Sequence, residues 1–82
     1  MDPEFVDRMR AALAQVTTVD VGPLTADRSI RELGLDSVTL AELLLTLEET
    51  EGITIEQTDI ERMKTLGDLQ GIILRLRAES AV

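Results

Sequence analysis

The stretch Gly34–Leu35–Asp36–Ser37–Val38 decides how the middle of this chain folds. Gly34 can close a turn, and Asp36 places a negative charge at the start of the following helix, where the helix dipole favours it. We predict this helix from about Ser37 to Thr50. Its core face consists of Leu40, Leu43, Leu44 and Leu47. A second face combines apolar and acidic residues, namely Val38, Ala41, Glu42, Leu45, Glu48 and Glu49.

The flanking segments predict further helices. An amphipathic helix is indicated by residues at helical spacing, Val6, Met9, Leu13 and Val16. The loop 17–28 follows, with Val21 and Leu24 as apolar anchors, and Ser29–Glu32 has the form of a capping box. Thr58–Glu61 repeats that form before a short third helix. The last helix begins at Thr65–Asp68 and carries Leu66, Leu69, Ile73 and Leu76. The pattern predicts an all-α fold, a small bundle of three main helices plus a short third helix.

The length of 82 residues predicts one small domain. We interpret residues 1–5 as a translated cloning scar that lies ahead of the helical pattern and contributes nothing to it. The domain is expected to span residues 6–78, with a flexible tail at 79–82. The chain contains no cysteine, so no disulfide holds the fold together.

The composition excludes most catalytic chemistry. The chain has no histidine to act as a base for a serine nucleophile, and Lys64 is its only lysine. Ser37 also lacks the glycine-flanked pattern of a nucleophile elbow. Without histidine or cysteine, zinc, haem and iron–sulfur sites lose their usual ligands. We therefore expect no catalytic residue, no metal site and no enzymatic activity.

The charge distribution restricts the partners. The net charge is −8, and no basic residue lies between Arg31 and Arg62. Nucleic acids and anionic membranes are therefore poor partners, and no apolar run approaches the length of a membrane span. We expect a cytoplasmic monomer. Helix stability does not explain Glu48, Glu49 and Glu51 near a helix C-terminus, so these residues either keep the protein soluble or steer it toward basic partners.

The residues from Gly34 to Glu49 carry a resemblance to a known family. The Asp36–Ser37 pair at the head of an acidic, leucine-rich helix resembles the modification site and recognition helix of acyl carrier proteins. The resemblance extends from Val6 to Arg77 in helix order, loop lengths and acidity. It implies that Ser37 receives phosphopantetheine from coenzyme A through a separate phosphopantetheinyl transferase. Ser37 would then be an acceptor that carries an acyl group as a thioester.

The same resemblance implies roles for neighbouring residues. Asp36 would take part in recognition by the transferase. Partner contacts would come from Val38, Ala41 and Leu45, and salt bridges to basic docking patches from Glu42, Glu48 and Glu49. These patches would belong to acyl-loading, condensing or tailoring enzymes. The family also has a cleft for acyl chains, which would here involve Leu40, Leu43, Ile60 and Met63.

Two alternatives remain beside an acyl carrier of a bacterial polyketide or related secondary-metabolite pathway. Ala41 and Gly52 are smaller than the residues usual at these positions in the fatty-acid carriers of the family. Together with an arginine-rich composition typical of GC-rich genomes, they favour that pathway over primary fatty-acid synthesis. One alternative is an aminoacyl, peptidyl or glyceryl carrier of a nonribosomal or mixed pathway. The other is a helical interaction module without a prosthetic group, in which Ser37 is only a helix cap.

Overall fold

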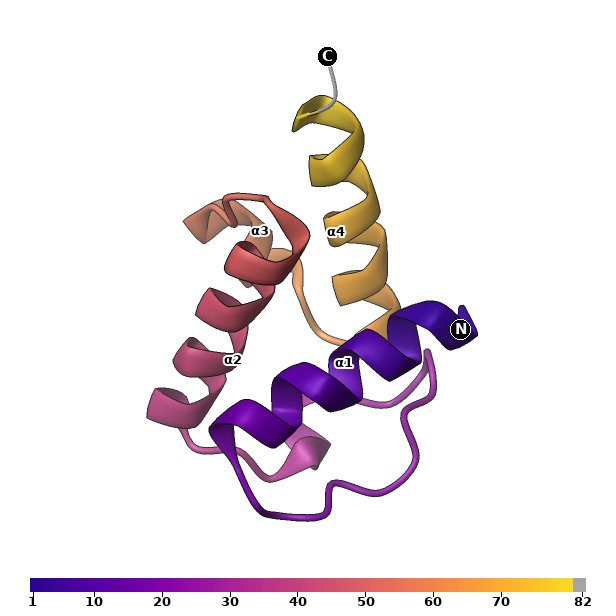
Figure 1. The fold of residues 1–82 in the computed structure, drawn as a ribbon, viewed down its shortest axis with the longest axis vertical. Helices are drawn as coiled ribbons and strands as arrows, with labels where there is room; N and C mark the ends of the chain where they lie inside the picture. The colour runs from indigo at the N-terminus through magenta and orange to yellow at the C-terminus, as the bar shows by residue number, and fades with distance from the viewer. Residues whose placement is uncertain (81–82) are drawn as a thin grey trace.

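The computed structural model describes residues 1–80. Its elements follow the order α1 (Pro3–Val16), a 3-10 turn η1 (Ile30–Leu33), α2 (Ser37–Glu51), α3 (Gln57–Arg62) and α4 (Leu66–Ser80). Figure 1 shows α1 crossing between α2 and α4, with the long loop after α1 running below it. The predicted all-α bundle of three main helices and a short third one is confirmed for this part of the chain.

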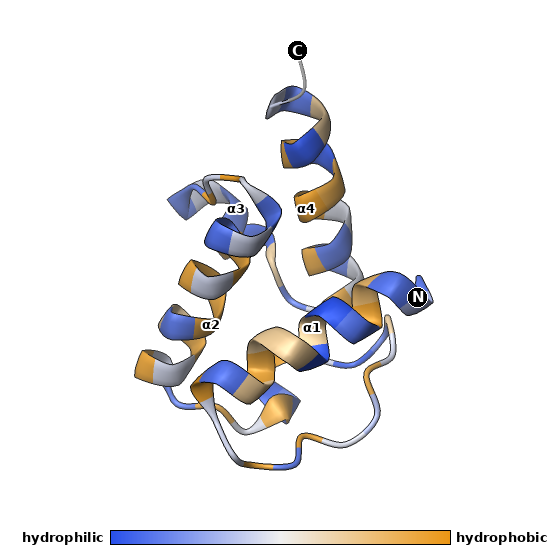
Figure 2. Cartoon of the chain, in the orientation of Figure 1, coloured by the Kyte–Doolittle hydropathy of each residue, from blue (hydrophilic) through white to orange (hydrophobic). Residues whose placement is uncertain are grey.

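A single aliphatic core joins the helices. Figure 2 shows hydrophobic residues recurring between hydrophilic ones along α1, α2 and α4. The side chains with the least exposure are Phe5, Met9, Leu43, Leu47, Leu66, Leu69 and Ile73. Val21 and Leu24 are also buried, so the predicted anchors of the loop after α1 are confirmed. Side chains of the helices and of the longest loop therefore pack in one hydrophobic cluster.

The N-terminal residues belong to the first helix. The Asp2 carboxylate accepts a hydrogen bond from the Glu4 N–H at 3.0 Å and caps α1, while Pro3 occupies the first turn. Phe5 is only 2% exposed. The expectation that residues 1–5 contribute nothing to the helical pattern is wrong, because Phe5 extends the buried stripe one turn ahead of Met9. Their interpretation as a cloning scar concerns origin and stays a prediction.

Backbone hydrogen bonds tie the loop after α1 to the start of α4. Ser29 and Thr65 form an isolated antiparallel bridge, in which the Ile30 N–H donates to the Lys64 carbonyl oxygen at 2.9 Å. The Leu66 N–H donates in turn to the Arg28 carbonyl oxygen at 3.0 Å. The two segments are far apart in the sequence, so this bridge fixes η1 against the linker between α3 and α4.

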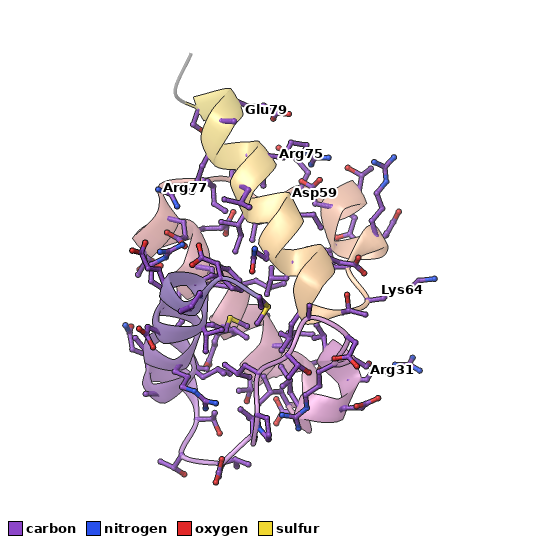
Figure 3. All side chains as sticks on the ribbon, turned by 90° about the vertical axis from the view of Figure 1, so that its right-hand side faces the viewer. Arg31, Asp59, Lys64, Arg75, Arg77 and Glu79 are labelled. Atoms are coloured by element: carbon purple, nitrogen blue, oxygen red, sulfur yellow. The ribbon has the colours of Figure 1, made fainter. Side chains whose placement is uncertain are left out.

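The start of α3 differs from the predicted one. The capping box uses Glu56 and Asp59 in place of Thr58 and Glu61. The Asp59 carboxylate accepts a hydrogen bond from the Glu56 N–H at 3.0 Å and also pairs with the Arg75 guanidinium of α4. Figure 3 shows Asp59 and Arg75 next to each other between the two helices. This additional partner on α4 selects Asp59 over the exposed Glu61.

The last helix is longer than expected. Glu79 and Ser80 are helical, and Arg75 lies 3.7 Å from the Glu79 carboxylate one turn later. The predicted tail at 79–82 is therefore wrong for these two residues, because α4 continues through them. Ala81 and Val82 lie outside the described residues. Across residues 1–80, no helix combines the length and the apolar character that crossing a membrane requires.

Replacing Phe5 tests whether the N-terminal residues stabilise the fold. Phe5→Ala should lower the free energy of unfolding by about 3 to 5 kcal/mol, because it removes a fully buried aromatic side chain and leaves a cavity. Urea unfolding followed by circular dichroism measures this change. Leu74→Ala is the control, since Leu74 is 51% exposed and its loss should change little. Equal effects of the two substitutions would contradict the burial of Phe5.

The pKa of Asp59 predicts a loss of stability in acid. It lies below its ordinary value of 3.8, because the Glu56 N–H and then the Arg75 guanidinium favour the ionised carboxylate. A lowered pKa stabilises the fold fully above the unfolded value of 3.8, and this contribution disappears as the pH falls through the folded pKa.

Asp59→Asn should therefore lower the urea midpoint at neutral pH, and the difference from the wild type should shrink as the pH falls below 3.8. The midpoints of both proteins, measured over a series of pH values, check this expectation. A difference that stays constant down to the most acidic pH at which both proteins fold would show that ionisation of Asp59 does not contribute.

Candidate functional site

Ser37 occupies the first position of α2 and is exposed. Gly34 adopts the left-handed conformation, with φ 76°, and ends η1, so the chain turns sharply before the helix. The Asp36 carboxylate accepts a hydrogen bond from the Thr39 N–H at 2.7 Å and is the N-cap. The hypothesis that Ser37 caps this helix is wrong, because Asp36 already occupies that position. The Ser37 hydroxyl has no hydrogen-bond partner within residues 1–80 and stays available for modification.

The chemistry beside Ser37 suits an acceptor. The pKa of Asp36 lies below its ordinary value, because hydrogen bonds from the Thr39 backbone and the Thr39 side chain favour the ionised form. A carboxylate with a lowered pKa is a poor base for a serine hydroxyl. Within residues 1–80, no three acidic side chains form a group that could hold a metal ion. An exposed hydroxyl on a fixed helix end can receive a group from another protein, and this fits covalent attachment of a phosphate-linked arm.

The second face of α2 is exposed. Val38 is 66% and Leu45 is 56% exposed, and Ala41, which lies between them in the sequence, is also exposed. Glu42 and Glu49 flank these apolar residues and form no side-chain hydrogen bond or ion pair within the described part of the chain. The structure therefore brings an apolar strip and unpaired carboxylates together on the helix that begins at Ser37.

Two glutamates of α2 have structural contacts that the sequence did not reveal. The Glu48 carboxylate accepts a hydrogen bond from the Ile55 N–H at 2.8 Å and so holds the segment after α2. The Glu51 side chain is only 5% exposed and pairs with Arg8 of α1 at 2.9 Å. The expectation that stability does not explain Glu48 and Glu51 is wrong, because both bind groups from other elements. Of the three glutamates at this helix end, Glu49 is the one without such a contact among residues 1–80.

An apolar cleft of about 580 Å³ lies beside the start of α2. Its lining residues are Ser29, Ile30, Arg31, Leu35, Leu40, Met63 and Lys64. The resemblance named Leu40 and Met63, which do line it. It also named Leu43 and Ile60, which do not, since Leu43 belongs to the closed core and Ile60 lies on the surface of α3. The residues from η1 were missed, because only the bridge between Ser29 and Thr65 brings η1 to this cleft.

Comparisons with known proteins agree with this arrangement. A family described as "Phosphopantetheine attachment site" matches residues 7–73. An acyl carrier protein of Saccharopolyspora erythraea is 33% identical over 79 residues, which cover 95% of this chain and 83% of the relative. An acyl carrier protein of Exiguobacterium sp. is 36% identical over 66 residues, covering 79% and 84%. Nodulation protein F of Rhizobium leguminosarum bv. trifolii is 38% identical over 64 residues, covering 74% and 70%.

The family match spans most of the chain and includes the turn before α2, Ser37 and the whole of α2. The relatives cover a similar share of the chain at a level of identity that indicates common descent. The chain therefore belongs to the acyl carrier protein family, whose members carry phosphopantetheine covalently attached to a serine.

Proposed function

We propose that Ser37 is the serine that carries phosphopantetheine. The chain has three serines. Ser29 is half-buried, and its hydroxyl accepts a hydrogen bond from the Arg31 N–H at 3.2 Å. Ser80 lies outside the residues that match the family. Ser37 alone of the three combines exposure, a place inside the match and a hydroxyl without a partner among residues 1–80, and this observation carries the proposal.

The attachment is a phosphoryl-group transfer from coenzyme A. The Ser37 Oγ forms a bond to phosphorus while the pyrophosphate bond of coenzyme A breaks. Adenosine 3′,5′-bisphosphate leaves with the bonding electron pair, and a base of the transferase takes the hydroxyl proton. Asp36 would aid recognition by the transferase through its carboxylate, which stays ionised beside the serine. The attached arm supplies the thiol that this chain lacks and allows an acyl thioester to form.

Partner enzymes would dock on the exposed face of α2. Val38, Ala41 and Leu45 offer apolar contact, and Glu42 and Glu49 offer charges that long-range attraction can steer toward basic patches. Glu48 contributes less to this docking surface than the family pattern implies, because its carboxylate is already bound to the Ile55 N–H. Docking on the helix that begins at Ser37 would bring the partner next to the attached cargo.

We place the carrier in bacterial polyketide or related secondary-metabolite biosynthesis. The smaller residues Ala41 and Gly52 support a role outside primary fatty-acid synthesis, and Gly52 adopts a left-handed conformation, with φ 67°, that favours glycine. One relative is named nodulation protein F, so a related sequence has a name other than that of a general acyl carrier protein.

Loading by a broad-specificity phosphopantetheinyl transferase tests the attachment site. With coenzyme A and magnesium, the wild-type protein should gain the mass of one phosphopantetheine, and Ser37→Ala should gain none. Because the Ser37 hydroxyl makes no hydrogen bond within residues 1–80, the variant should keep its thermal midpoint. Intact-mass spectrometry and thermal unfolding measure the two properties. Ser80→Ala is the matched control and should load normally; loading of Ser37→Ala would refute the assignment.

Charge removal on α2 tests the docking surface. The double variant Glu42→Gln/Glu49→Gln should lower kcat/KM of the transferase about threefold at low salt, with a smaller effect at high salt, because steering is screened. The initial rate of loading at several ionic strengths measures this. Glu4→Gln/Glu61→Gln removes the same charge from exposed positions of α1 and α3. An equal loss of rate in both double variants would mean that net charge alone matters.

A further inference from the structure

We propose that the cleft beside Ser37 binds an acyl cargo that ends in a carboxylate, with Arg31 and Lys64 as its cationic partners. The inference rests on the proposed attachment of the arm at Ser37. The new element is the chemical class of the cargo, which neither the α2 surface nor the attachment site specifies.

The cleft has two chemically different parts. Ile30, Leu35, Leu40 and Met63 provide apolar surface, and all four are either buried or packed against the core. Arg31 and Lys64 line the same cleft but are exposed. Figure 3 shows both side chains projecting from the same side of the molecule. A ligand that lies along the apolar part would therefore meet two positive charges where it reaches solvent.

Ion pairs within residues 1–80 do not include these two cations. Arg8 and Arg75 form ion pairs, and Arg10 and Arg28 donate hydrogen bonds to backbone carbonyl oxygens. Within residues 1–80, the side chains of Arg31 and Lys64 have no ion pair or hydrogen bond of this kind. Asp68 lies near Lys64. Its carboxylate accepts hydrogen bonds from the backbone N–H groups of Thr65 and Lys64, which lower its pKa most, and the Lys64 charge contributes to the same lowering without a direct ion pair. In a chain of net charge −8, two unpaired cations at one apolar cleft favour an anionic ligand.

Backbone hydrogen bonds hold together the two segments that carry the cations. The Ile30 N–H donates to the Lys64 carbonyl oxygen at 2.9 Å. Arg31 is the next residue after Ile30, so both cationic residues lie at this hydrogen bond. The bridge between Ser29 and Thr65 prevents the two segments from separating. The ordering of this backbone is thus completed during folding, so that cargo binding costs the ordering of the two side chains, the arm and the cargo but not of the backbone.

The cleft lies within reach of the attachment site. Leu40 is on the same side of α2 as Ser37, one turn further along the helix, and Leu35 precedes Ser37 by two residues. An arm attached to Ser37 therefore starts at the edge of the cleft. The cargo remains covalently tethered, which raises its effective concentration at the cleft and allows weak charge pairs to matter.

Two cargoes of equal length test the inference. The transferase loads Ser37 with pentanoyl- or glutaryl-phosphopantetheine from the corresponding coenzyme A thioesters, and the glutaryl chain differs by its terminal carboxylate. Methyl resonances of Leu40 and Met63, compared with the protein that carries the free thiol, report the occupancy of the cleft. Glutaryl cargo should occupy the cleft more than pentanoyl cargo.

The double variant Arg31→Gln/Lys64→Gln should lower the ratio of bound to free glutaryl cargo about threefold and leave pentanoyl cargo unchanged. Arg77→Gln is the control for loss of a positive charge, since Arg77 projects from the opposite side of α4 (Figure 3) and should have no effect. Resonances distant from the cleft verify that each variant is folded.

Equal occupancy by the two cargoes, or glutaryl occupancy that survives the double substitution, would overturn the inference while the protein remains a loaded carrier. Absence of loading at Ser37 would overturn the proposed function and the inference with it. Intact mass, recorded before the resonance measurements, distinguishes these two failures.

Discussion

Burial of the leucine face of α2 against α1 is the interaction on which the rest of the structure depends. Phe5 and Met9 of α1 and Leu43 and Leu47 of α2 are nearly inaccessible to solvent and belong to one cluster. A domain of this size has one small core, so this contact supplies a large part of its stability. It also determines the orientation of α2. Once one face is committed to the core, the face with Val38 and Leu45 must remain outside, and Ser37 comes to lie at an exposed helix end.

The acidic residues divide into two groups with different physical roles. Asp36, Asp59 and Asp68 accept backbone hydrogen bonds at the starts of α2, α3 and α4, and each has a lowered pKa for that reason. Glu48 and Glu51 hold other elements against α2. Glu42 and Glu49 have no such contact within residues 1–80. The strongly negative charge thus serves folding and, in the proposed function, recognition, and only the contacts of each carboxylate distinguish the two.

The proposed attachment site and the cleft depend on the same short segment. Residues 29–36 contain the bridge to Thr65, the turn at Gly34 and the cap Asp36. The bridge brings η1 to the linker before α4 and so forms the cleft, while the cap fixes the first turn of α2 and so places Ser37. Leu35 and Leu40 both line the cleft and lie on either side of Ser37 in the sequence, so a cargo attached at Ser37, as proposed, would start next to it.

The sequence by itself determined the order of the four helices, the turn before Ser37 and the family resemblance, because helical periodicity, glycine turns and a short motif are local properties. Only the tertiary structure decided that Phe5 belongs to the core, that Asp59 and not Glu61 completes a capping box, and that Glu48 and Glu51 are structural. The same holds for the meeting of Arg31 and Lys64 at one cleft. Glu48, Asp59 and Glu51 contact residues that are 7, 16 and 43 positions away in the sequence, and periodicity carries no information about such contacts.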